Sequence, residues 1–189
     1  MFRAPMALRR VEESDIQAKG RGKMIKSIAA SVCLLLVAAT AAANGPATKP
    51  VTVDIKNAEG QSVGTATLSE APHGVKIKID IKNLPPGEHS LHIHQFAKCE
   101  APDFKSAGPH FGMHLGHGAA PAGDIPDFSL IVGADRAAHT SVIAPYVTMG
   151  EDDHSVFSNG GTALVIHDVA SAGAAAPARI ACGVISKPE

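Results

Sequence analysis

The 189-residue sequence contains no tryptophan and one tyrosine, and it has no hydrophobic run long enough for a membrane-spanning helix. The apolar run at residues 28–37 falls short of that length. With 18 glycines and 13 prolines, the composition is rich in turn-forming residues and favours β structure. The length fits one domain.

The first 43 residues are typical of a secretory leader. Lys26 precedes the apolar run, which ends in the small residues 38–43, a pattern typical of an A-x-A cleavage site. The acidic residues before position 16 are unlike a leader, so we expect translation to begin at Met24. We therefore expect residues 44–189 to form a single exported domain, periplasmic or extracellular, with no stable membrane anchor after cleavage.

Positive charge and cysteine are both scarce in the expected mature chain. The leader holds seven of the 17 Lys and Arg residues and three of the 18 Asp and Glu residues, which leaves 10 and 15 and a net charge of about −5. A basic stripe for nucleic acid is therefore excluded. Cys33 departs with the leader. Cys99 and Cys182 in an exported domain most simply form one disulfide, with two free buried thiols as the alternative.

Alternating apolar and polar residues predict about eight short strands. We expect them at residues 51–55, 63–68, 75–84, 87–95, 128–132, 140–144, 162–167 and 179–185. Residues 96–126 show no sustained periodicity, and a loop of this length inside a compact domain is usually functional or disordered. The histidines in this loop favour function. The pattern predicts an antiparallel β-sandwich or barrel.

The most informative stretch is the strand expected at residues 87–95. With a period of two, Leu91 and Ile93 point one way while His92 and His94 point the other. Two imidazoles on one face suit a single copper or zinc ion. The alternative is a half-buried strand whose polar residues face solvent.

Four further features lie downstream. A histidine follows Gly-Pro in the long loop, another ends a strand, an aspartate follows Ala-Gly, and an arginine stands three residues before the last cysteine. They are His110, His167, Asp124 and Arg179. Each feature is a weak signal by itself, but the order and spacing of all four form a highly specific pattern.

In these motifs the sequence resembles the copper/zinc superoxide dismutase family, over roughly residues 51–186. The resemblance implies a Greek-key antiparallel β-barrel with long metal-binding loops and the disulfide between Cys99 and Cys182. It implies that Arg179 receives the anion beside the copper and that His89 has a structural role. The implied copper ligands are His92, His94, His110 and His167, of which His110 would also bridge to zinc.

The zinc half of the family pattern is altered in this chain. Pro121 stands where the family has a second zinc histidine, directly before Ala122-Gly123-Asp124. One of His114 and His117, in a shortened loop, replaces the first, and His117 is the better candidate. If both His114 and His117 reach the ion, the two could still build a tetrahedral zinc site together with His110 and Asp124. Ser171 stands where the family usually has an aspartate, and the segment between His167 and Arg179 is short. This combination resembles the copper-only branch of the family.

The function that these residues predict is an exported superoxide dismutase that converts superoxide to oxygen and hydrogen peroxide. Copper on nitrogen ligands can change oxidation state, whereas zinc cannot. His110 is the candidate proton donor, and Arg179 keeps its charge and offers a fork of donors to a small anion. The competing hypotheses are a copper-holding or copper-delivery protein on the same fold and a structural barrel without metal. Relatives are often dimers, so a homodimer is possible.

Overall fold

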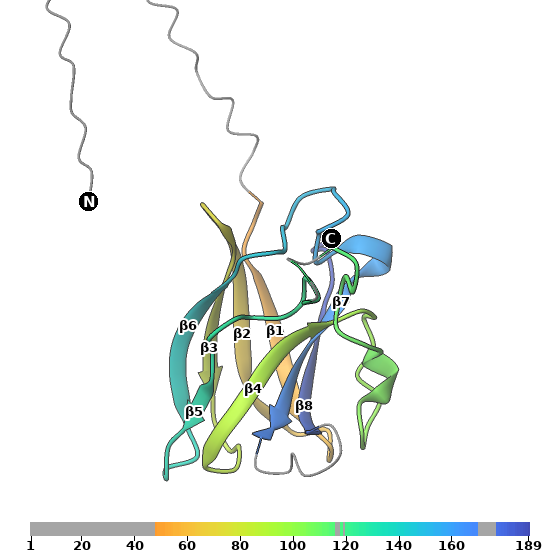
Figure 1. Cartoon of the computed structure of the whole chain (residues 1–189). Helices are drawn as coiled ribbons and strands as arrows, with labels where there is room; N and C mark the ends of the chain where they lie inside the picture. The colour runs from red at the N-terminus through yellow and green to blue at the C-terminus, as the bar shows by residue number, and fades with distance from the viewer. Residues whose placement is uncertain (1–47, 116–117, 119, 170–176) are drawn as a thin grey trace, which may run out of the picture. The chain divides into compact units, whose positions relative to one another are not determined.

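Eight antiparallel strands form one sheet that nearly closes into a barrel (Figure 1). The computed structural model describes residues 48–115, 118, 120–169 and 177–189. The strands are β1 (Val51–Asn57), β2 (Ser62–Ala71), β3 (Gly74–Ile81), β4 (Gly87–His94), β5 (Leu130–Val132), β6 (Ala138–Ala144), β7 (Thr162–Asp168) and β8 (Ala178–Ile185). The predicted all-β barrel is confirmed. In the described residues, no helix is long and apolar enough to cross a membrane.

The strand order has a Greek-key character. It runs β5-β4-β7-β8-β1-β2-β3-β6, so β1, β2 and β3 form a meander and the last strand returns to pair with the first. The connections from β3 to β4 and from β6 to β7 join strands that are not neighbours. As a result, β4 and β7, which carry three of the predicted copper ligands, lie side by side although they are far apart in the sequence.

The barrel core follows the predicted alternation. In β3, Val75, Ile77 and Ile79 are buried, while Lys76 and Lys78 between them are exposed. Each such buried aliphatic side chain contributes about 1.5–3 kcal/mol relative to an exposed one. β3 ends at residue 81, earlier than the predicted 84, because Asn83 has a positive φ of 61° and turns the chain.

Strand β7 is buried on both faces. Leu164 and Ile166 belong to the barrel core, whereas Ala163 and Val165 face a second, smaller apolar cluster outside it. The predicted long loop between β4 and β5 covers this outer face and contains a short 3₁₀ turn, η1 (Lys105–Ala107). The second cluster therefore anchors the loop that carries His110.

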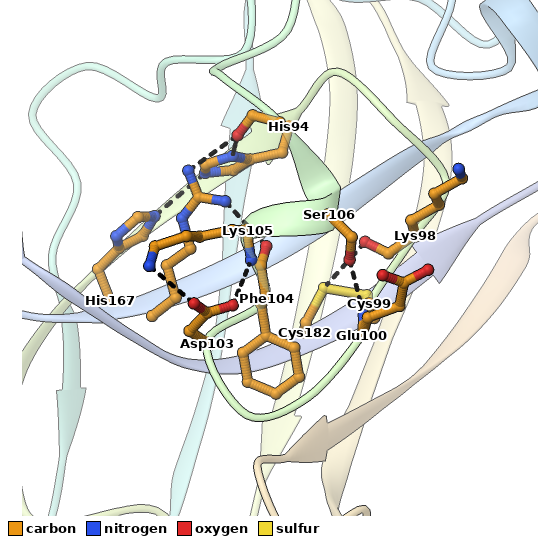
Figure 2. Close-up of a disulfide and its surroundings, with 12 residues drawn as sticks. His94, Lys98, Cys99, Glu100, Asp103, Phe104, Lys105, Ser106, His167 and Cys182 are labelled. Atoms are coloured by element: carbon orange, nitrogen blue, oxygen red, sulfur yellow. Dashed lines mark hydrogen bonds and ion pairs between the residues drawn. A yellow bond between two sulfur atoms is a disulfide. The ribbon is translucent and has the colours of Figure 1, made fainter.

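The loop is also held covalently. Cys99 and Cys182 form a disulfide with a Cα–Cα distance of 5.6 Å, which ties the loop to β8. The predicted disulfide is confirmed. Figure 2 shows this link together with the residues around it.

Candidate metal centre

Strand β4 supplies two neighbouring histidines. Leu91 and Ile93 enter the barrel core and fix the rotation of the strand, so His92 and His94 project from the other face. His94 is fully buried and His92 is partly buried. The predicted alternation is confirmed here.

The loop places His110 beside the end of β4. The backbones of His94 and His110 form an isolated antiparallel bridge, and the Gln95 N–H donates to the Pro109 carbonyl oxygen at 2.9 Å. The His110 ring stacks on the ring of His92, with 4.2 Å between their centroids. A residue 16 positions after His94 in the chain is thereby brought to the same site.

Gly123 brings Asp124 to His110 through a close approach of backbones. Its N–H donates to the Phe111 carbonyl oxygen, and its own carbonyl oxygen accepts from the Ile93 N–H, each at 2.9 Å. A Cβ atom at this position would overlap the Ile93 carbonyl oxygen, so only glycine fits. The adjoining Asp124 Oδ1 accepts a hydrogen bond from His110 Nδ1 at 2.5 Å.

Two imidazoles point unprotonated nitrogens at each other. His94 Nδ1 lies 2.9 Å from the Gly108 carbonyl oxygen and His167 Nδ1 lies 3.3 Å from the Pro177 carbonyl oxygen. Because a carbonyl oxygen only accepts, both Nδ1 atoms carry the hydrogen, and the Nε2 lone pairs are left free. These two Nε2 atoms are 3.1 Å apart. A cation placed between them satisfies both lone pairs.

The four histidines form one potential metal-binding group. His92, His94, His110 and His167 each offer one ring nitrogen, and these atoms all lie within 4.8 Å of one another. Moreover, His92 Nδ1 is buried and has no hydrogen-bond partner, which is costly unless the atom serves as a ligand. Four imidazole nitrogens from distant parts of the chain are a donor set that suits copper.

The electrostatics of the site keep three of the four histidines neutral. Burial lowers the pKa of His92 to about 4 and that of His94 to about 3. Repulsion from the neighbouring histidines, and from Arg179 in the case of His94, would add to the cost of a proton there. The pKa of His167 is lowered for the same first reason. At neutral pH these imidazoles are unprotonated, as metal ligands must be.

Arg179 is held beside this group by two carbonyl oxygens. Its Nη1 donates to the Phe104 carbonyl oxygen and its Nη2 to the Gly108 carbonyl oxygen, both at 2.8 Å. Its positive charge lowers the pKa of His94 and His167. The arginine is partly exposed, so a small anion can reach it from solvent.

A bulge between β7 and β8 aims Arg179 at the histidines. Ile166 pairs with Ala181, but His167 pairs with Arg179, so β8 carries one extra residue there. Both Ala181 and Ile180 pack against the barrel core, and the extra residue returns Arg179 to the outer face. Without the bulge, period-two alternation would turn the guanidinium away from His167.

The remaining predicted residues lie elsewhere. His114 is exposed and lines a surface cavity with Glu151 and Asp153, and it is not among the four clustered histidines. His117 lies outside the described residues, as do Ser171, Met24 and the leader. His89 is buried and its Nε2 lies 2.8 Å from the Pro85 carbonyl oxygen, which confirms its expected structural role.

The sequence did not indicate the groups that orient the site residues through hydrogen bonds. The carbonyl oxygens of Phe104 and Gly108 carry no sequence signal, because every residue has a carbonyl group. The Gln95 side chain, whose Oε1 accepts from the Gly112 N–H at 3.1 Å, was also missed. Its position directly after His94 was the one available hint.

Comparison with known proteins decides the family. The profile described as "Copper/zinc superoxide dismutase (SODC)" matches residues 62–185. The chain belongs to the copper/zinc superoxide dismutase family. Among curated members, it is 40% identical over 146 residues to Superoxide dismutase [Cu-Zn] 1 of Aquifex aeolicus, covering 70% of this chain and 85% of the relative. It is 34% identical over 154 residues to Superoxide dismutase [Cu-Zn] of Caulobacter vibrioides, covering 71% and 84%.

Solved structures agree with this family. A superoxide dismutase-like (SOD-like) protein from Bacillus subtilis superposes with a TM-score of 0.61 at 30% identity, covering 70% of this chain and 96% of that one. The family name and the group of four histidines together imply copper at this site.

Proposed function

We propose that this protein is an exported superoxide dismutase that uses one copper ion held by His92, His94, His110 and His167. The observation that carries the proposal is the convergence of four ring nitrogens within 4.8 Å beside the fixed guanidinium of Arg179. The reaction takes two superoxide anions and two protons and gives oxygen and hydrogen peroxide. One superoxide is oxidised and the other is reduced.

Copper bound here would supply the one-electron oxidation and reduction. The protein residues supply the rest. Arg179 attracts and orients the superoxide anion through its remaining N–H donors, because with a mature net charge of about −5 the attraction must be local. His110 would bind copper through Nε2, since its Nδ1–H donates to Asp124, and the same Nε2 could hold and deliver a proton only while it is not bound to the metal. Gly108 holds His94 Nδ1–H and thereby keeps Nε2 free for the metal.

We propose further that the site works with copper alone. Two ligands of a tetrahedral zinc ion, each about 2.0–2.1 Å from the metal, lie about 3.3 Å apart. The 2.5 Å between His110 Nδ1 and Asp124 Oδ1 instead supports a direct hydrogen bond. Asp124 is then the acceptor that orients His110. The exposed position of His114 supports the same proposal.

Export is the third part of the proposal. It is supported by the leader-like sequence of residues 1–43 and by the disulfide, which persists in oxidising compartments. N-terminal sequencing of the protein isolated from the cell envelope and medium tests the cleavage. The homodimer suggested by the family resemblance stays a prediction, which sedimentation of the purified protein tests.

A copper-holding protein on the same fold is the competing proposal, because one solved relative is called SOD-like rather than a dismutase. Replacing Arg179 by alanine separates the two functions. A dismutase loses about tenfold or more of its rate at unchanged copper content, since local charge raises the on-rates of anions by about 10 to 10³. In a copper carrier, the substitution should change neither the copper content nor any background rate of dismutation.

Arg136→Ala is the matched control for this experiment. Arg136 is the other arginine after the leader, is exposed, and donates to the Asn83 carbonyl oxygen. Its loss should leave the rate unchanged. An equal, small effect of both substitutions would contradict the proposed role of Arg179.

A further inference from the structure

Phe104 has a backbone conformation that is uncommon for an aromatic residue. Its φ of 51° and ψ of 23° lie in the left-handed region, which bulky side chains rarely adopt. Phe104 directly precedes η1 and lies inside the loop closed by the disulfide. Such a conformation persists only where the surroundings enforce it.

The enforcing contact is the burial of the phenyl ring. Phe104 is 1% exposed, and its ring belongs to the small apolar cluster on the outer face of β7. Its neighbours in that cluster are Ala107, Ala163, Val165, Cys182 and the partly buried Cys99. Figure 2 shows the ring near the disulfide and on the opposite side of its own backbone from His94 and His167.

The same conformation turns the Phe104 carbonyl group toward the site. Its oxygen accepts from Arg179 Nη1 at 2.8 Å and from the Ala107 N–H at 3.1 Å. Gly108, at the other end of η1, supplies the second acceptor of the guanidinium. Two carbonyl oxygens, one before and one after a single 3₁₀ turn, therefore fix the orientation of Arg179.

We propose that Phe104 is the positioning residue for Arg179: its buried ring holds the left-handed backbone that directs its carbonyl oxygen at the guanidinium. The proposal concerns the orientation of the Arg179 guanidinium, whatever anion binds to it. Its consequence for superoxide rests on the proposed function, because a guanidinium that rotates freely presents its donors to an anion only part of the time.

The first test observes Arg179 directly, by ¹⁵N–¹H NMR of guanidinium groups in the copper(I)-loaded protein, which is diamagnetic. The mature chain has two arginines, so Arg136 serves as an internal reference. In the native protein, Arg179 should show resolved Nη–H signals with slow rotation. Phe104→Leu should broaden them and Phe104→Gly should average them, while the Arg136 signals stay unchanged.

The second test measures the affinity of azide, a small anion, for the copper(II)-loaded protein. Phe104→Gly keeps φ accessible but removes the anchor, so azide should bind about tenfold more weakly, as expected for the loss of one hydrogen bond to a charged group. The azide affinity of Phe104→Leu should lie between those of the native protein and Phe104→Gly. In the Arg179→Ala background, neither substitution should change the azide affinity further.

Leu68→Ala is the control for a general loss of stability. Leu68 is fully buried in the barrel core on β2, and its truncation should destabilise the protein without changing the Arg179 signals or azide affinity. If Phe104→Gly does not fold, Phe104→Leu alone decides. Unchanged Arg179 signals and azide affinity in Phe104→Leu would overturn the inference. If those measurements behave as expected but the native protein does not dismutate superoxide, the positioning role stands and the proposed function fails.

Discussion

Arg179 and His94 donate hydrogen bonds to the same acceptor, the carbonyl oxygen of Gly108. The Nη2 of Arg179 lies 2.8 Å from this oxygen and the Nδ1 of His94 lies 2.9 Å from it. One backbone group thus orients a predicted copper ligand and the proposed anion-binding residue together. A displacement of Gly108 should therefore affect both.

Gly108→Ala is the direct test of this shared contact. Gly108 has φ of 76°, and a Cβ atom there would lie 2.5 Å from the Phe96 ring. Either the half-exposed Phe96 ring or the Gly108 backbone must shift. We expect the backbone to move, with lower copper occupancy, weaker azide binding and a loss of about 1–3 kcal/mol in unfolding free energy. Gly60→Ala is the matched control, since Gly60 has the same φ of 76° and open space around it. Equal effects of the two substitutions on copper and azide would contradict the shared role.

Acid should destabilise the metal-free protein. Burial holds the pKa of His92 at about 4 and that of His94 at about 3 in the folded state, against an ordinary value of 6.5. Below pH 6.5 these histidines are protonated in the unfolded chain but not in the folded protein, so stability falls as the pH falls from about 6.5 toward 3. The melting temperature of the metal-free protein, followed by circular dichroism, should decrease through this window. His92→Gln should reduce the slope, and an identical slope in that variant would refute the explanation.

Asp124 should behave as a hydrogen-bond acceptor. Asp124→Asn keeps an oxygen that can accept from His110 Nδ1–H, whereas Asp124→Ala does not. After dialysis against both metals, we expect copper without stoichiometric zinc in all three proteins. We also expect a smaller loss of dismutation in the asparagine variant than in the alanine variant. One zinc per native chain that disappears in Asp124→Asn would identify Asp124 as a zinc ligand instead.

The disulfide should stabilise the fold as well as the loop. It joins residues 83 positions apart, and removal of a native disulfide costs about 2–5 kcal/mol. Urea denaturation of the Cys99→Ala/Cys182→Ala variant should show this loss. A reductant should lower the midpoint of the native protein and leave that of the variant unchanged. Equal midpoints for the native protein and the variant would contradict the prediction.

Much of the barrel could be predicted because its signals are local. Alternation in the sequence indicated which residues of β3 and β4 are buried, and His92 and His94 follow from the same period. The disulfide followed from the presence of two cysteines in an expected exported domain and from the resemblance to the family. The convergence of His110 and His167 followed from that resemblance alone, since nothing in the local sequence brings these residues together.

Other parts of the site depend on tertiary contacts without a local pattern. The bulge that turns Arg179 toward His167 is a property of the pairing between two strands. The left-handed conformation of Phe104 runs against the preference of its own side chain, and burial of the ring decides it. The contact between Asp124 and His110 depends on how closely Gly123 approaches Ile93.

Titration of the metal-free protein with copper(II), with dismutation measured at each addition, tests the central claim most directly. The four-histidine site predicts that activity rises linearly with copper and reaches its plateau at about one ion per chain, well above the rate of the same amount of free copper. Copper that binds without producing activity, or activity no higher than that of free copper, would contradict it.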